Sequence, residues 1–207
     1  MYDLMVDIET LDTHPSAVVL SIGAVVFDRF DTPGRHGPTF YVELTGDIQS
    51  QIDHGRTISA DTLIWWMCQS PEARNVFDHP DEDTPRRTIN QAASNFSKFC
   101  VDHRVRYIWA KDPDFDVSIL RSLFEMYGWG FPFKYHEARA VRTVLDMPFV
   151  PSKQTKPVAH NALADAIAQA TDIQEALQCL KSVTQSSESP AAPEAAKTPA
   201  PSSSSAT

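Results

Sequence analysis

Three strand-like runs follow one another at the beginning of this chain, and a fourth stands far downstream. The first three cover residues 2–9, 17–28 and 39–44, and a Thr/Asp/Pro loop joins the first two, which predicts a meander of neighbouring strands. The fourth run, residues 105–110, is a continuous apolar segment typical of a buried strand.

Apolar residues at helical spacing fill most of the remaining chain. Ser59 and Ser70-Pro71-Glu72 are typical of helix starts, because Ser caps a helix and Pro fits its first turn. The predicted apolar stripes are Leu63, Trp66 and Met67; Ile89, Ala92, Ala93, Phe96 and Phe99; Ile119, Leu120, Leu123 and Phe124; and Leu163, Ile167, Ala170, Leu177 and Leu180. Strands first, then helices alternating with a strand, predict an α/β domain built on a mixed sheet.

The last part of the sequence differs in composition from the rest. Residues 182–207 consist mainly of Ser, Ala, Pro and Thr and show no apolar periodicity, so we expect a disordered tail. The whole chain has 207 residues, of which 42% are hydrophobic, which is enough for one sizeable core. We therefore expect residues 1–181 to form a single domain.

Composition and charge exclude several classes of protein. The three cysteines, Cys68, Cys100 and Cys179, have no Cys-x-x-Cys spacing, which argues against a disulfide framework or a thiolate zinc site. The sequence has neither a typical signal peptide nor a run of about 18 apolar residues, so we expect a cytoplasmic protein without a membrane partner. A net charge of -9 argues against a partner held by a broad basic surface.

Two carboxylates lie at alternate positions of the first predicted strand. Asp7 and Glu9 therefore share one face with Met5, about 7 Å apart, where both could bind one cation. The 27 acidic residues make such pairs common by chance, and a strand end that emerges into water is the competing interpretation. Carboxylates inside an apolar strand, however, need a metal or a cationic partner to offset their desolvation.

Two further polar clusters precede predicted helices. Asp112, Asp114 and Asp116 lie between the fourth strand and a helix, where an Asp can simply cap the helix or favour its dipole. His160 precedes Asp165 by five residues at the start of the last helix, where a solvated acid and a surface His are the simplest interpretation. Small alanines around Asp165 would let this helix approach the sheet closely.

Taken together, Asp7-Ile8-Glu9, Phe115-Asp116 and the His160/Asp165 pair resemble the motifs of the DEDDh 3′-to-5′ exonucleases of the RNase H-like superfamily. Residues 62–74, TLIWWMCQSPEAR, are similar to a stretch in the branch of exoribonuclease-like and phage exonuclease A-like domains. The resemblance implies an RNase H-like (RNase T-like) fold, with a mixed central sheet flanked by helices. It also implies hydrolysis of RNA or DNA from a single-stranded 3′ end to nucleoside 5′-monophosphates.

The resemblance also assigns roles to individual residues. Asp7, Glu9, Asp116 and Asp165 would hold two Mg²⁺ or Mn²⁺ ions, His160 would be the general base, and Thr10, Trp66 and Phe115 would contact the substrate. Many relatives carry Asn where Asp112 stands, so Asp112 and Asp114 are rival ligands to Asp116, which is preferred because Phe115 precedes it and an apolar helix follows. Trp65 and Trp66 are more typical of core residues than of stacking platforms, although one of them could line the groove.

Two alternative functions and the choice of substrate remain open at the level of the sequence. One is a nucleic-acid-binding or interaction module that uses the same scaffold without turnover. Another is an endonuclease or resolvase with the same metal chemistry, which would have little use for the His/Asp pair. The choice between RNA and DNA cannot be read from the motifs, because it depends on contacts to the 2′-hydroxyl. The resemblance also implies that two copies can associate as a homodimer.

Overall fold

The computed structural model describes residues 2–77, 87–148, 150 and 160–187. Its centre is a five-stranded sheet in the order β3-β2-β1-β4-β5. The strands are β1 (Tyr2–Thr10), β2 (Val19–Phe27), β3 (Thr39–Glu43), β4 (Val105–Ala110) and β5 (Ala138–Ala140). β1, β2 and β3 pair antiparallel, whereas β4 and β5 run parallel to β1, so the predicted mixed sheet is confirmed. The sequence prediction missed β5, because three residues show no periodicity.

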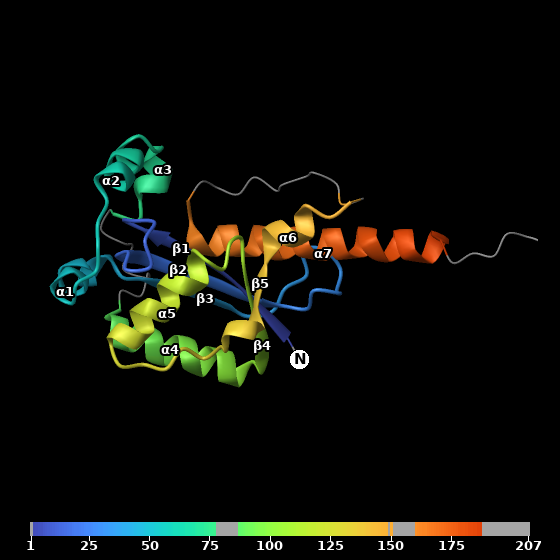
Figure 1. The fold of residues 1–207 in the computed structure, drawn as a ribbon, viewed down its shortest axis with the longest axis horizontal. Helices are drawn as coiled ribbons and strands as arrows, with labels where there is room; N and C mark the ends of the chain where they lie inside the picture. Colours follow the sequence, from blue (N-terminus) through green and yellow to red (C-terminus); the bar gives the residue numbers. More distant parts are fainter. Residues whose placement is uncertain (1, 78–86, 149, 151–159, 188–207) are drawn as a thin grey trace, which may run out of the picture.

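Helices cover both faces of this sheet (Figure 1). On one face lie α4 (Ile89–Asp102) and α5 (Asp116–Met126), and on the other lie α6 (Val141–Leu145) and α7 (Ala162–Ser187). Alternation along β1 explains this arrangement, because Leu4, Val6 and Ile8 pack toward α4 and α5, whereas Met5 packs toward α7. The predicted α/β fold with a mixed, helix-flanked sheet is therefore correct.

Helix α7 packs through small residues. The residues it buries are Ala162, Ala166, Ala170, Ile173 and Ala176, together with three polar residues, Gln169, Asp172 and Gln174. Of the five residues in the predicted apolar stripe of this helix, only Ala170 is fully buried. The alanine face of α7 lies so close to the sheet that the larger leucine and isoleucine side chains lie beside the contact and not within it. The helix also continues through Ser187, so residues 182–187 are helical and not part of a disordered tail. The rest of the predicted tail lies outside the described residues.

A glycine on β2 makes this close approach possible. At Gly23 an added Cβ would lie 2.2 Å from the backbone carbon of Ala162, the first residue of α7. Such a contact is far inside van der Waals range, so no larger side chain fits there without moving the helix. Gly23 pairs with Asp7 across the sheet, and the start of α7 is therefore held directly above the carboxylate-bearing part of β1.

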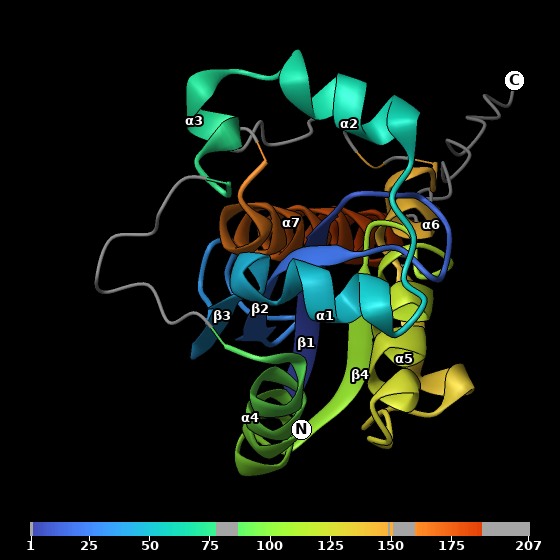
Figure 2. The ribbon, with the colours of Figure 1, turned by 90° about the vertical axis from the view of Figure 1, so that its left-hand side faces the viewer.

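The segment between β3 and α4 forms a separate group of short helices near one end of the sheet (Figure 2). It contains a 3₁₀ turn (Thr45–Asp47), α1 (Ile48–Asp53), α2 (Ala60–Met67) and α3 (Pro71–Arg74). Elsewhere in the chain, a second 3₁₀ turn (Tyr135–Glu137) precedes β5.

The caps and faces of α2 and α3 match the sequence prediction only in part. Ser70 caps α3 as predicted, with its side chain accepting from the Ala73 amide, and α2 follows Ser59. The predicted apolar face of α2 is wrong, because Trp66 is buried while Leu63 and Met67 are exposed. Within the described residues, no helix combines the length and apolarity needed to cross a bilayer.

Candidate active site

Strand β1 carries two carboxylates beyond the end of its pairing with β4. The parallel ladder between the two strands ends at Met5 and Trp109, and Asp7 and Glu9 follow on the face that α7 covers. The antiparallel register with β2 shifts between Glu9 and Thr10, an irregularity of the kind that re-aims side chains next to sites. Both carboxylates therefore project where the central strands end, which is where ligands bind in open α/β sheets.

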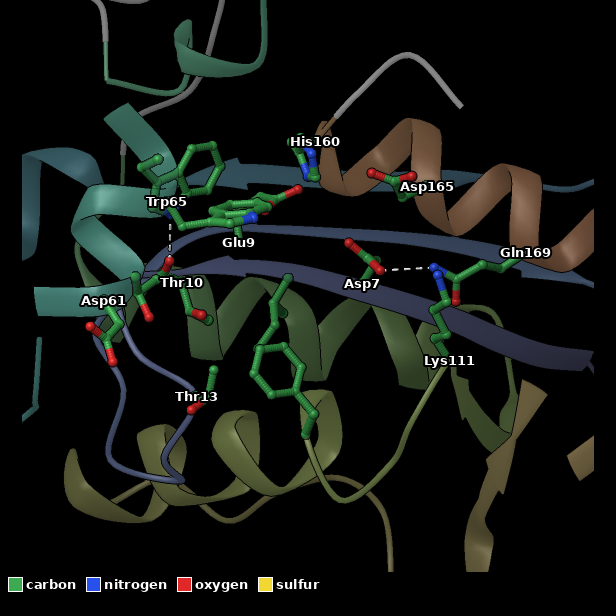
Figure 3. Close-up of a pocket in the computed structure, with 14 residues that line it drawn as sticks. Asp7, Glu9, Thr10, Thr13, Asp61, Trp65, Lys111, His160, Asp165 and Gln169 are labelled. Atoms are coloured by element: carbon green, nitrogen blue, oxygen red, sulfur yellow. Dashed lines mark hydrogen bonds between the residues drawn. The ribbon is translucent and has the colours of Figure 1, made fainter. Parts of the chain in front are cut away.

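Helix α7 adds a third carboxylate to this pair. Asn161 precedes the helix, and its side-chain oxygen accepts from the Ala164 amide at 3.0 Å, which fixes the first turn. Asp165 in this turn lies over β1, and one ligand oxygen each from Asp7, Glu9 and Asp165 lies within 4.8 Å of the others. Figure 3 shows the Asp7 and Asp165 side chains on either side of one space. The simplest interpretation of Asp165, a solvated helix acid, is therefore wrong.

Asp116 approaches the same strand from the opposite side. It begins α5 and is 3% exposed, whereas its rivals Asp112 and Asp114 are exposed. Burial raises its pKa to about 7, although a hydrogen bond with the Ile8 backbone opposes this effect. The charge of Asp116 in turn raises the pKa values of Asp7 and Glu9. Among the three candidates of this loop, the fold brings Asp116 next to the cluster, although its oxygens are not among those within 4.8 Å.

Burial raises the pKa of every carboxyl group in this cluster, and repulsion between the groups adds to this effect at Asp7 and Glu9. Burial is the largest cause for Asp7, whose pKa is well above its usual range, with further increases from Asp116, Glu9 and Asp165. Burial and the charges of Asp165 and Asp116 raise the pKa of Glu9 to about 8. Burial also raises the pKa of Asp165, while His160 and Lys111 oppose that effect. Cations are the partners that such a cluster lacks, and its all-oxygen donor set fits Mg²⁺ or Mn²⁺.

His160 stands at the edge of the site, directly before α7 (Figure 3). Its φ angle of 58° is in the left-handed region, which marks the sharp entry of the chain into the helix. Its ring lies edge-on against Trp65, with centroids 4.7 Å apart, and 5.9 Å from the centroid of Trp66. Two aromatic rings of α2 thus form one side of the histidine's surroundings.

These groups line a cavity of about 510 Å³. Its wall includes each predicted site residue except Asp116, namely Asp7, Glu9, Thr10, Trp66, Phe115, His160 and Asp165. The sequence analysis missed Thr13, Asp61, Thr62, Lys111 and Gln169, and it assigned the substrate contact to Trp66 and not to Trp65.

The three predicted substrate contacts differ in how much they offer to a ligand. Trp66 is 2% exposed and donates from Nε1 to the Thr10 carbonyl oxygen at 2.8 Å, which makes it a core residue at the cavity floor. Trp65 is 43% exposed and is the tryptophan available for stacking. The Thr10 hydroxyl donates to the Asp12 carbonyl oxygen at 2.7 Å, so it is already engaged. Phe115 is partly exposed and keeps its place on the wall.

A mixed five-stranded sheet with helices on both faces defines the class of RNase H-like folds, which the sequence analysis predicts. Within this class the chain belongs to the family of 3′-5′ exoribonuclease Rv2179c-like domains, whose model matches residues 2–177. The predicted relationship to the 3′-5′ exonucleases is confirmed at the level of this family.

Individual relatives agree with this assignment. An exodeoxyribonuclease of Enterobacteria phage T4 is 30% identical over 134 residues, an alignment that covers 59% of this chain and 56% of the phage protein. E. coli exonuclease I has a similar fold in complexes with 5cy-dA13 and dA16 oligonucleotides, with TM-scores of 0.53 and 0.55 and identities of 14% and 13%. Each of these two matches covers 89% of this chain and 42% of exonuclease I.

Proposed function

We propose that this protein is a divalent-metal-dependent 3′-5′ exonuclease of the DEDDh type, acting on single-stranded nucleic acid. The observation that carries the proposal is the convergence of Asp7, Glu9 and Asp165, from opposite ends of the sequence, within 4.8 Å in one cavity. Buried like charges at such spacing are unfavourable unless a cation binds them. Membership of an exoribonuclease-like family and the position of His160 beside the cluster support the same conclusion.

In this proposal the four carboxylates divide the work of metal binding. Asp7, Glu9 and Asp165 would hold one Mg²⁺ or Mn²⁺ ion, and Asp7 and Asp116 would hold a second one. When bound, two such ions activate a water nucleophile and stabilise the leaving 3′-oxygen in an in-line displacement. The buried position of Asp116 and its charge effect on Asp7 support its inclusion.

His160 would accept the proton of the attacking water. Imidazole is the most common side chain for this role near neutral pH. Its place at the cavity edge, before the helix that carries Asp165, puts the base and a metal ligand on one short segment. T-shaped contacts with the rings of Trp65 and Trp66 would help to orient the imidazole ring for this role.

The cavity wall suits the terminal nucleotide of an unpaired strand. Trp65 offers an exposed ring for stacking. Phe115 and Lys111, both from the loop before α5, form another part of the wall. Among the described lining residues, Lys111 is the one Lys or Arg, and it would contact a phosphate. Such a wall would bind a 3′ end through metals and stacking and does not need a broad basic surface, which fits a protein of net charge -9.

Isosteric substitution in the cluster tests this function. We expect Asp7→Asn and His160→Gln to lower Mg²⁺-dependent trimming of 5′-labelled RNA and DNA oligonucleotides by at least about 100-fold, as is typical for groups that act on the reacting atoms. The exposed Asp114→Asn is the matched control and should keep full activity. Matched RNA and DNA substrates identify the preferred sugar. Full activity of both site variants would refute the proposal.

The same assay separates the alternative functions. An exonuclease leaves circular single-stranded DNA intact, whereas an endonuclease opens it. A binding module without turnover would retain an oligonucleotide without releasing nucleoside 5′-monophosphates at any Mg²⁺ concentration. Release of mononucleotides from linear substrate, with circular substrate intact, is the result we expect.

A further inference from the structure

Gln169 on α7 contacts the acidic cluster without being part of it. Its side-chain nitrogen Nε2 donates to Asp7 Oδ1 at 2.8 Å (Figure 3). We propose that Gln169 is a positioning residue that fixes one oxygen of Asp7 and thereby presets the cluster for a divalent cation. This inference rests on the proposed function, because it concerns the same cation site.

The helical register places Gln169 for this contact. It follows Asp165 by four residues, so the two side chains lie one turn apart on the same face of α7. Its neighbours on this face, Ala166, Ala170 and Ile173, are fully buried apolar residues packed toward the sheet. Gln169 itself is only 9% exposed, so a polar side chain is held here in surroundings that would suit an apolar one.

Of the two polar atoms of the Gln169 amide, only the nitrogen has a hydrogen-bond partner among the described residues. When a cation binds and Asp7 is ionised, only the amide nitrogen can face this carboxylate, because the amide oxygen in that place would repel it. The oxygen Oε1 is buried and, among the described residues, has no hydrogen-bond partner. An unsatisfied buried acceptor costs about 1–3 kcal/mol. Stability therefore does not explain why a glutamine stands here, whereas the hydrogen bond to Asp7 does.

A neutral donor is the type of group that a cation site needs at this point. An Arg or Lys side chain could also hold Asp7, but its positive charge would compete with a divalent cation for the carboxylate. The Gln169 amide instead occupies one oxygen of Asp7 and leaves the negative charge of the cluster in place. Hydrogen-bonded supports of this kind typically change metal affinity 10–100-fold when they are removed.

Calorimetric titration with Mn²⁺ alone tests the inference without any hydrolysis. We expect Gln169→Met, which keeps the length of the side chain but lacks the donor, to bind Mn²⁺ about 10–100-fold more weakly than the wild type. In EDTA its melting temperature should stay equal to or above that of the wild type, because the unsatisfied oxygen is gone. Gln169→Asn, whose amide is too short to reach Asp7, provides a second variant with the same expected loss.

Gln174 supplies the matched control on the same helix. It is 1% exposed and makes three hydrogen bonds to the segment between β2 and β3, with the Gly34 amide and the carbonyl oxygens of Asp28 and Arg35. Gln174→Met should therefore melt at a lower temperature but bind Mn²⁺ within about twofold of the wild type. Wild-type affinity in both Gln169 variants, or an equal loss in Gln174→Met, would overturn the inference.

The wild-type protein distinguishes this inference from the proposed function. If it trims oligonucleotides while Gln169→Met binds Mn²⁺ normally, the function stands and the positioning role fails. If Mn²⁺ binding depends on Gln169 but no oligonucleotide is hydrolysed, the positioning role stands and the exonuclease proposal fails. If the wild type binds no Mn²⁺, the positioning role is overturned whatever the hydrolysis assay shows.

Discussion

At the scale of single residues, the cluster keeps carboxyl groups where a folded protein can least accommodate their charge. Glu9 is 8% exposed, and its neighbours Asp116 and Asp165 are acidic as well. Burial and repulsion both favour the protonated form, so the cation-free protein takes up protons at this site as it folds. Protonation and cation binding are thus two ways to relieve the same unfavourable charge.

This linkage predicts an unusual dependence of stability on pH. Glu9 has an ordinary pKa of 4.5 and a folded-state pKa of about 8, so its contribution to stability is fully present below 4.5 and is lost as pH rises through 8. In EDTA we therefore expect the free energy of unfolding to fall between pH 5 and 8, by at most about 1.4 kcal/mol per pH unit for this group. Denaturant titrations at a series of pH values measure the slope.

Two further measurements test whether this dependence of the unfolding free energy on pH arises from the acidic cluster. Glu9→Gln should make it shallower, and Mn²⁺ should stabilise the wild type more at pH 8 than at pH 5, because fewer protons compete for the carboxylates. An unchanged slope in Glu9→Gln would show that the dependence arises elsewhere in the molecule.

At the scale of secondary-structure elements, the site depends on how closely α7 lies against β2. Asp165, Gln169 and His160 all belong to this helix or to its entry, while Asp7 and Glu9 belong to β1. Small residues on both sides make this close contact possible, namely the alanine face of α7 and Gly23 on β2. A displacement of about 1 Å at this contact is enough to change a catalytic geometry severely.

We expect Gly23→Ala to remove activity while the sheet still forms. The new Cβ would meet backbone atoms of Ala162 and Leu163, which cannot rotate away, so the start of α7 must move. Mn²⁺ affinity and the rate of trimming should fall at least about 100-fold, while the far-ultraviolet circular dichroism spectrum remains that of a folded protein. Gly130→Ala, where nothing lies within 4 Å of the new Cβ, is the matched control and should stay near wild type. Equal activity of the two variants would contradict this account.

At the scale of the whole molecule, the site is complete well before the end of the chain. Its lining runs from Asp7 to Gln169, and the buried residues of α7 extend to Ala176. The chain is acidic overall, with 27 acids against 18 bases, and four of those acids are the proposed metal ligands. Part of the net charge is therefore located in the site.

Truncation tests how much of the chain the activity needs. Removal of residues 188–207 should leave trimming within about twofold and the melting temperature unchanged, because every described lining residue is kept. Truncation after Asp172 removes the buried Ile173, Gln174 and Ala176 and should prevent stable folding. A loss of activity above tenfold in the shorter deletion, with unchanged melting temperature, would show that residues 188–207 contact the substrate.

The local pattern of the sequence was sufficient for the main elements and for the candidate site residues. Alternation placed Asp7 and Glu9 on one face of β1, and capping and periodicity located α3, α4 and α5. These features depend on neighbours within a few residues, so they can be read from the chain directly. The resemblance to exonuclease motifs added the link between segments that are far apart.

Only the tertiary structure decided which groups meet. It buried Asp116, which the sequence analysis already preferred, while Asp112 and Asp114 are exposed. It also brought Asp165 to Asp7 and Glu9, and it separated a buried Trp66 from an exposed Trp65. It also revealed Gln169 and Gly23, which have no distinctive sequence pattern because their roles depend on a helix and a strand more than 130 residues apart. Local spacing sets the direction of a side chain on its own element, whereas burial, pKa and cation binding depend on what the packed elements place opposite it.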